Sequence, residues 1–197
     1  MEFKDINDIK PIRLLEEHYH NALNRKQDNI EAIVISSLDS KTNHVDARFV
    51  NLKFIHGDKF IFFSNYNSPK STQFISNPNI TAVIFWSKIN LQVRIRGVID
   101  KIPSRDSDTY FRSRDLKKNA LSISSNQSKK IDSYNKVQKK YNDVLESNDL
   151  GIRPKYWGGF FFRPNYFEFW EGKKHRLNKR TVYLKGKKIW SKFYLEP

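Results

Sequence analysis

The sequence has no cysteine and little glycine or proline, with 7 of each among its 197 residues. The lack of cysteine excludes disulfides, zinc–thiolate sites, iron–sulfur clusters and cysteine nucleophiles. The scarcity of glycine and proline excludes collagen-like architecture, and 14% aromatic residues argue against intrinsic disorder. No apolar run approaches the roughly 20 residues of a membrane-spanning helix. The first residues lack the pattern of a signal peptide, so we expect a cytoplasmic protein with no membrane partner.

Positive charge is the strongest bias in the composition. Lysine and arginine number 36 against 21 acidic residues, which gives a formal net charge of +15 at pH 7. Such an excess favours anionic partners, namely nucleic acid, acidic lipid or phosphorylated small molecules. A generally basic, solvated surface explains the same composition, and composition alone leaves both interpretations open.

The distribution of apolar and turn residues predicts a mainly β protein with peripheral helices. Strands are expected at 32–37, 45–55, 59–64, 81–86, 91–101, 157–163, 166–170, 180–184 and 188–194. Helices are expected at 11–24, 71–76, 104–113 and 132–147, whereas 116–130 is predicted to be polar and irregular. Short connections with little β–α alternation favour an antiparallel barrel or sandwich. We expect one domain over 1–197, in which 1–25 form an N-terminal helix or arm.

Several familiar catalytic motifs are missing. The sequence has neither G-x-G-x-x-G nor G-x-x-x-x-G-K-[ST], and no G-x-S-x-G that would mark an acyl-transfer serine. The five histidines include no H-E-x-x-H, and His18 and His20 are two residues apart, so their spacing does not predict a metal site. If the chain is an enzyme, we expect a bound cofactor to supply the chemistry.

Basic residues at strand ends and in polar loops are the candidates for binding an anion. Arg48 and Lys53 are five residues apart, so a regular strand sends them to opposite faces. Either a bulge breaks this alternation, or the two cations serve separate anions. Two solvent-exposed cations on an edge strand are the structural alternative.

Two further groups could bind a phosphate. Tyr110 and Arg114 would lie on one face of a helix, where a phenol and a guanidinium could converge. Ser64, Ser68 and Lys70 flank a polar loop before a predicted helix, which is a second place for an anion. A tyrosine stacked on an arginine at the surface, and an ordinary polar loop, explain the same residues without function.

Several motifs occur together in the order and spacing of one enzyme family. W-G-G-F at 157–160 is followed by E-F-W-E-G at 168–172 and R-L-N-K-R at 176–180. R-F-V-N-L-K occupies 48–53, and Y-F-R-S-R occupies 110–114. Over roughly residues 30–197 the sequence resembles the pyridoxine/pyridoxamine 5′-phosphate oxidases.

This resemblance implies a split β-barrel homodimer that binds FMN at the subunit interface. It places Arg48, Ser64 and Lys70 at the FMN phosphate. The other residues that it places at the cofactor are Val50, Phe63, Gln92, Gln127, Ser128, Trp170 and Arg180, some of them from the partner subunit. Arg48 and Lys53 would then serve two different phosphates.

For the substrate, the resemblance implies that Lys53, Tyr110 and Arg114 bind a 5′-phosphate, with Lys118 beside them. Arg176 would lie over the pyridine ring, and Asn178 would reach the ring hydroxyl. The implied reaction is hydride transfer from C4′ of pyridoxine or pyridoxamine 5′-phosphate to FMN. Dioxygen then reoxidises the flavin, which yields pyridoxal 5′-phosphate and hydrogen peroxide.

The sequence departs from the family at several of these positions. Pro69 stands where an arginine is usual, Lys118 where a serine is usual, and Asn178 where R-L-H-x-R has histidine. Glu171 replaces a glutamine, and residues 1–11 show no counterpart of the arginine and tyrosine that close over the substrate. FMN binding is therefore better supported than the identity of the substrate.

Three alternatives follow from these departures and from the charge. The first is a related flavin oxidase that acts on another ring, as in phenazine biosynthesis. The second is a protein that binds FMN without turnover. The third is a basic β-barrel that binds nucleic acid. It is disfavoured because the cations occupy flavin-motif positions and form no continuous run.

Overall fold

The computed structural model describes residues 1–6, 9–146, 149–187 and 189–197. Its strands are β1 (Glu2–Lys4), β2 (Ala32–Asp39), β3 (His44–His56), β4 (Lys59–Asn65), β5 (Asn79–Trp86), β6 (Leu91–Lys101), β7 (Trp157–Glu171), β8 (Lys179–Lys185) and β9 (Trp190–Leu195). Its helices are α1 (Lys10–Asn24), α2 (Pro69–Ser76), α3 (Ser104–Ser113), α4 (Leu116–Ser124) and α5 (Tyr134–Leu145), with single 3-10 turns η1 (Ser87–Ile89) and η2 (Lys174–Arg176). None of the described helices combines the length and apolar character needed to cross a membrane.

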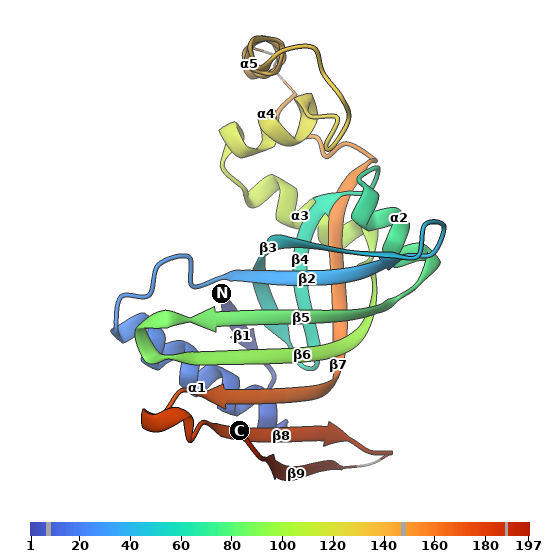
Figure 1. Cartoon of the computed structure of the whole chain (residues 1–197). Helices are drawn as coiled ribbons and strands as arrows, with labels where there is room; N and C mark the ends of the chain where they lie inside the picture. Colours follow the sequence, from blue (N-terminus) through green and yellow to red (C-terminus); the bar gives the residue numbers. More distant parts are fainter. Residues whose placement is uncertain (7–8, 147–148, 188) are drawn as a thin grey trace.

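The strands form one sheet that closes on itself over part of its width. The order is β1-β3-β2-β5-β6-β7-β8-β9, and β4 pairs with both β3 and β7. The strands β3, β2, β5, β6, β7 and β4 therefore make a barrel, beyond which β8 and β9 continue the sheet (Figure 1). Apart from the parallel pair β1–β3, the pairings are antiparallel. The prediction of a mainly β protein with peripheral helices is confirmed.

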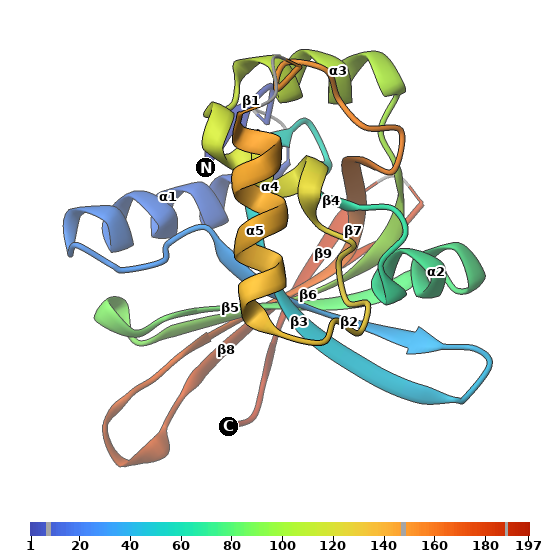
Figure 2. The ribbon, with the colours of Figure 1, turned by 90° about the horizontal axis from the view of Figure 1, so that it is seen from above.

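The barrel interior is filled by side chains that alternate along the strands. Ile33 and Ile35 of β2 are fully buried, as are Phe60 and Phe62 of β4. This period of two is what a strand with one buried face requires. In Figure 2, α1 and α2 lie on opposite sides of the barrel, and Figure 1 shows α3, α4 and α5 at one end of it.

Two sequence predictions about the elements were wrong. Segment 116–130 is not wholly irregular, because its first half is α4, which begins after an N-cap bond from the Lys118 amide to Asp115. The strands expected at 157–163 and 166–170 are one strand, β7. Proline lacks the N–H that a sheet ladder needs, which argued for a break at Pro164. On one edge, β7 pairs with β4 up to Phe162 and with β8 from Tyr166 onward. Pro164 lies between these two pairings, so no ladder hydrogen bond is lost on that edge.

Other boundaries shift by a few residues. The short strand β1 was not predicted and pairs with β3. The helix expected at 132–147 is described as Tyr134–Leu145, and the strand expected at 188–194 as Trp190–Leu195. The predicted ends at 147 and 188 lie outside the described residues. The described residues therefore contain nine strands and five α-helices, against about nine strands and four helices expected.

A bulge interrupts β3 at Lys53. Leu52 pairs with Phe62 of β4, but Phe54 pairs with Ile61, so Lys53 is the extra residue. As a result, Leu52 and Ile55, three apart, both point into the core. This is the break in alternation that the spacing of the two β3 cations raised as a possibility.

Candidate functional site

A buried lysine lies at the centre of the first group of candidate residues. The Lys70 ammonium donates to Ser64 Oγ at 3.2 Å, Ser68 Oγ at 3.1 Å and Gln127 Oε1 at 3.1 Å. We call these four residues the Lys70 cluster. Ser64 is the last residue but one of β4, and Lys70 lies in the first turn of α2, which begins with a proline at its first position. The strand-to-helix connection thus brings the polar side chains together.

The charge of Lys70 is uncompensated. Lys70 is only 8% exposed, and its ammonium group donates hydrogen bonds to neutral oxygen atoms alone. Within the described residues no carboxylate lies within 4 Å of its ammonium group. Burial, with a smaller contribution from Arg48, lowers the pKa of Lys70 to about 8. A buried, unpaired cation of this kind favours binding of an anion.

Arg48 of β3 lines a cavity together with Lys70. Its guanidinium donates to Ser37 Oγ at 2.6 Å and to Gln73 Oε1 at 2.9 Å, and lies 3.6 Å from Asp46. Burial lowers its pKa, and Asp46 opposes that shift. Ser37 and Gln73 were not expected from the sequence, because they come from β2 and α2, far away in the chain. A cavity of about 350 Å³ is lined by Arg48, Asp46, Phe49, Pro69, Lys70, Gln127 and Ser128.

An adjoining cavity of about 450 Å³ contains most of the other predicted residues. Its lining includes nine of them, Val50, Lys53, Phe63, Ser64, Lys70, Tyr110, Arg114, Lys118 and Gln127. We call Lys53, Tyr110, Arg114 and Lys118 the Lys53 cluster. Arg48 and Lys53 thus line two different, adjoining cavities, which is the arrangement that separate anions would require. Asp115 also lines this cavity, as its one acidic residue among those described.

Aromatic rings form one wall of the second cavity. Tyr110 stacks on Phe63 with centroids 3.8 Å apart, and Phe63 stacks on Trp157 at 5.4 Å. The guanidinium of Arg114 lies 4.4 Å from the centre of the Trp157 ring and donates to Ser122 Oγ at 3.1 Å. The helical i, i+4 pairing of Tyr110 and Arg114 was wrong in detail, because α3 ends at Ser113 and Arg114 has an extended backbone. Stacking on Trp157 brings the guanidinium to the cavity instead.

The remaining predicted residues form a separate group, the Trp170 cluster of Gln92, Trp170, Arg176, Asn178 and Arg180. Trp170 of β7 pairs with Gln92 of β6 on one side and with Arg180 of β8 on the other. Arg176 and Asn178 lie in the connection between β7 and β8, where Arg176 has a positive φ of 61°. None of the five lines either cavity described above. Trp157 and Trp170 are thirteen residues apart along β7, a strand length of about 40 Å.

A buried carboxylate orients Arg180. Glu168, 3% exposed, accepts from Arg180 Nε at 2.9 Å and from the Tyr166 hydroxyl at 2.8 Å, and it also pairs with Arg94. Burial alone would raise the pKa of Glu168, but these hydrogen bonds hold it below its ordinary value. The carboxylate therefore stays charged and fixes the guanidinium. The motif E-F-W contained this residue, but only the sheet pairing gives it a function.

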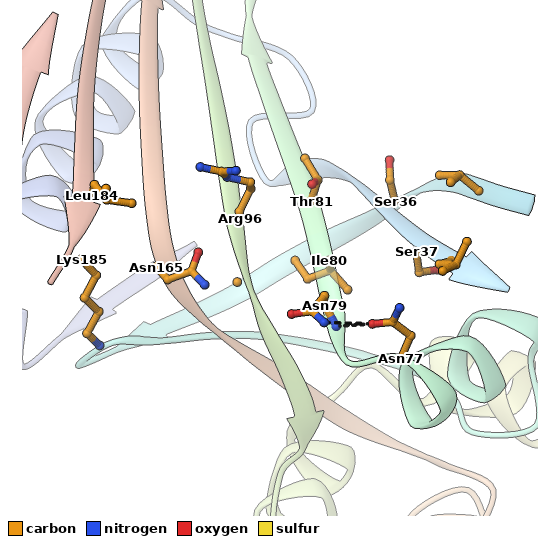
Figure 3. A pocket seen from close by; sticks show the side chains of 13 residues that line it. Ser36, Ser37, Asn77, Asn79, Ile80, Thr81, Arg96, Asn165, Leu184 and Lys185 are labelled. Atoms are coloured by element: carbon orange, nitrogen blue, oxygen red, sulfur yellow. Dashed lines mark hydrogen bonds between the residues drawn. The ribbon is translucent and has the colours of Figure 1, made fainter. Parts of the chain in front are cut away.

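A further cavity, of about 610 Å³, contains none of the predicted residues. Figure 3 shows side chains from β2, β5, β6, β7 and β8 around it, including Ser37, Asn79, Thr81, Arg96, Asn165 and Lys185. The Arg96 guanidinium lies 4.0 Å from the centre of the Tyr166 ring. This cavity has no cluster comparable to that around Lys70, so the first two cavities are the candidates for a cofactor site.

Two family models match most of the chain. Residues 17–147 match a family model described as pyridoxamine 5′-phosphate oxidase. Residues 157–197 match a model described as the pyridoxine 5′-phosphate oxidase C-terminal dimerisation region. The chain belongs to the pyridoxine/pyridoxamine 5′-phosphate oxidase family. The resemblance inferred from the motifs is thereby confirmed.

Curated members of this oxidase family align with nearly the whole chain. The pyridoxine/pyridoxamine 5′-phosphate oxidase of Legionella pneumophila strain Paris is 34% identical over 189 residues, covering 95% of this chain and 87% of that protein. The oxidase of Bacteroides fragilis strain ATCC 25285 is 35% identical over 192 residues, covering 95% and 80%.

Solved structures establish the fold of this oxidase-family chain. PhzG from Burkholderia lata 383, solved with tetrahydrophenazine-1-carboxylic acid, superposes with a TM-score of 0.88 at 22% identity, covering 95% of this chain and 92% of that one. A pyridoxamine 5′-phosphate oxidase-related, FMN-binding protein from Nostoc punctiforme gives 0.80 at 13% identity, covering 96% and 99%. The predicted split β-barrel is confirmed.

FMN is the cofactor that family membership assigns to this chain. The residues present fit its phosphate, because the buried Lys70 ammonium has hydroxyl and amide neighbours but no carboxylate partner. A phosphate monoester, with close to two negative charges at neutral pH, compensates such a group. Pro69, in place of the usual arginine, supplies no donor at this position.

Proposed function

We propose that the chain is an FMN-dependent oxidase of pyridoxine or pyridoxamine 5′-phosphate and works as a homodimer. The observation that carries the proposal is the pair of adjoining cavities, in which Arg48 lines the first, the Lys53 cluster lines the second, and Lys70 lines both. When bound, FMN would supply the two-electron chemistry that oxidises C4′ of the substrate at the expense of dioxygen. The products would be pyridoxal 5′-phosphate and hydrogen peroxide, with water consumed and ammonia released when the substrate is the amine. The chain itself contributes binding and orientation.

The first cavity and the Lys70 cluster would hold the FMN phosphate, with Arg48 as a second cation. The Arg48 guanidinium donates hydrogen bonds to side-chain oxygens of Ser37 and Gln73, and these keep it in place before a ligand arrives. Val50, Phe63, Gln127 and Ser128 would border the rest of the cofactor. Because these groups come from β3, β4, α2 and the segment after α4, the site depends on the folded barrel.

The Trp170 cluster would complete the site from the partner subunit. It lies at the end of β7 away from Trp157, and it falls within the matched dimerisation region apart from Gln92. Two copies related by a two-fold axis exchange such elements reciprocally, so each dimer would hold two equivalent sites. Gln92, Trp170 and Arg180 would then contact the flavin. The Glu168 carboxylate would hold Arg180 in position for that contact.

The Lys53 cluster would bind the 5′-phosphate of the substrate. Arg114 can present a planar pair of donors, while Lys53 and Lys118 act as point charges. Tyr110, whose pKa is raised by burial, stays a neutral hydroxyl donor at physiological pH. Arg176 of the partner would lie over the pyridine ring as an electrostatic and steric contact, since a guanidinium keeps its proton. Asn178 would face the ring hydroxyl.

A spectroscopic experiment tests this function. The purified protein should show the flavin spectrum, and anaerobic addition of pyridoxine or pyridoxamine 5′-phosphate should bleach it. A flavin that stays oxidised would contradict the proposed substrate and favour another ring compound or a binder without turnover. Tight DNA binding that weakens steeply with salt would favour a nucleic-acid function instead.

The role of Arg176 can be separated from cofactor binding. Arg176→Leu should slow anaerobic bleaching about 10- to 100-fold while the yellow colour persists, because the residue is assigned to the substrate and not to FMN. Lys174→Leu, in the same 3-10 turn, is the matched control and should bleach at the normal rate. Loss of FMN from the Arg176 variant would contradict the assignment.

A further inference from the structure

A carboxylate that lines neither cavity contacts the lysine assigned to the substrate, and no sequence motif marks its position. The Glu31 side chain accepts a hydrogen bond from the Lys53 ammonium. Glu31 directly precedes β2, and its backbone carbonyl accepts from the Leu52 amide at 2.9 Å. This bond fixes the start of β2 beside the bulge that displaces Lys53, and so determines that the two side chains meet.

The carboxylate is charged and acts on more than one member of the Lys53 cluster. Burial alone would raise the pKa of Glu31, but hydrogen bonds from Lys53 and from the Met1 ammonium, 2.6 Å away, hold it below its ordinary value. Burial also raises the pKa of Tyr110, and Glu31 adds to that shift while Lys53 and Arg114 oppose it. Glu31 therefore lowers the positive potential where the substrate's phosphate would bind.

The contact between Glu31 and Lys53 contributes little to stability by itself. The side chains of Glu31 and Lys53 are 31% and 33% exposed, and ion pairs open to water contribute little to folding. The Lys70 cluster offers the contrast, since there the lysine is buried and has only neutral partners. The carboxylate is thus placed at the lysine assigned to substrate, and none is placed at the lysine assigned to FMN.

We propose that Glu31 is a specificity-determining residue that competes with the substrate's phosphate for Lys53. The inference rests on the proposed function, because it takes Lys53 as part of the substrate site. Binding of a phosphate dianion would require Lys53 to turn from Glu31 to the ligand. Glu31 therefore weakens binding of the phosphorylated substrate and promotes release of the phosphorylated product. The affinity for a ligand without the phosphate would not depend on Glu31.

The direct test is Glu31→Gln in the FMN-loaded protein, because glutamine keeps the size and the hydrogen bond but removes the charge. We expect the KM for pyridoxine 5′-phosphate to fall about 3- to 10-fold with kcat within twofold. The kinetics with unphosphorylated pyridoxine should not change. Glu17→Gln, an exposed position on α1, is the matched control and should leave both substrates unaffected. An unchanged or higher KM for the phosphorylated substrate would overturn the proposal.

A binding measurement separates this inference from the proposed reaction. Calorimetric titration of the FMN-loaded protein with inorganic phosphate should show about 3- to 10-fold tighter binding after Glu31→Gln. The same change made together with Lys53→Met should have no effect. If the wild-type protein does not oxidise pyridoxine 5′-phosphate but this pattern holds, the reaction is wrong and the competition stands. If the protein turns over but phosphate binding is the same with and without Glu31, the competition is wrong.

A folding defect is detected by loss of bound flavin or of thermal stability. If Glu31→Gln shows either, Glu31→Thr, which removes the charge and the direct contact, is measured in the same titration. The proposal requires tighter phosphate binding in whichever variant keeps its flavin. Weaker binding in that variant would contradict it.

Discussion

Lys53 and Lys70 line the same cavity, yet their surroundings differ. Lys70 is buried, contacts only hydroxyl and amide oxygens, and has a lowered pKa of about 8. Lys53 is about one-third exposed and is paired with the Glu31 carboxylate. The first lysine lacks a counter-charge until an anion binds, whereas the second already has one.

This difference matches the two kinds of ligand that the site is proposed to hold. A cofactor that remains bound can supply the missing negative charge permanently, so a buried uncompensated cation can persist in the working protein. A substrate that arrives and leaves in each cycle needs a site whose empty state is also stable. An internal carboxylate provides that state, at the expense of some affinity for the phosphate.

The largest expected effect tests the Lys70 side of the comparison. Lys70→Met should weaken FMN binding about 100-fold or more, because it removes charge-assisted hydrogen bonds to a buried phosphate. Fluorescence titration of the apoprotein with FMN measures this, with Lys117→Met, exposed on α4, as the control. A loss of less than threefold would mean that the Lys70 cluster is not the FMN phosphate site.

A smaller effect is expected on the substrate side. Arg114→Lys should raise the KM for pyridoxine 5′-phosphate about tenfold, since lysine can neither stack flat on Trp157 nor offer paired donors. FMN affinity should stay within twofold. The exposed Arg112→Lys serves as the control in the steady-state assay. Equal losses of FMN and of substrate affinity would abolish the distinction between the two clusters.

The pH dependence of cofactor binding should sharpen the comparison further. The ammonium form of Lys70 binds the phosphate, and burial lowers its pKa to about 8, so its proton is lost as the pH rises through that value. The affinity of the apoprotein for FMN should therefore fall about tenfold between pH 7 and pH 9. Lys70→Arg, which stays protonated, should remove this dependence. A flat profile in the unmodified protein would contradict the role of Lys70.

Much of the site could be predicted from the sequence, because the family motifs contain its chemical groups. The residues expected at the two phosphates do line two adjoining cavities. The spacing of apolar residues also predicted most of the strands and helices, since this spacing reflects contacts within a few residues of chain. The predictions for segment 116–130 and for β7 were wrong for the same reason. Whether a weakly amphipathic segment forms a helix, and whether a strand continues through a proline, depends on contacts with residues far away in the chain.

Residues that act by contacting a partner far away in the chain could not be identified from the sequence. Gln73 positions Arg48, Glu168 positions Arg180, and Glu31 pairs with Lys53 across 22 residues of chain. None of these three lies at a spacing that marks it locally.

The sequence by itself determined the family, the mainly β architecture and the inventory of cationic, amide and aromatic groups, because side-chain chemistry and short-range periodicity are written in the order of residues. Only the tertiary structure decided which lysine has a carboxylate partner and which predicted residues share a cavity. Those properties depend on strand register, on the bulge at Lys53 and on burial, which arise when segments far apart in the chain pack together.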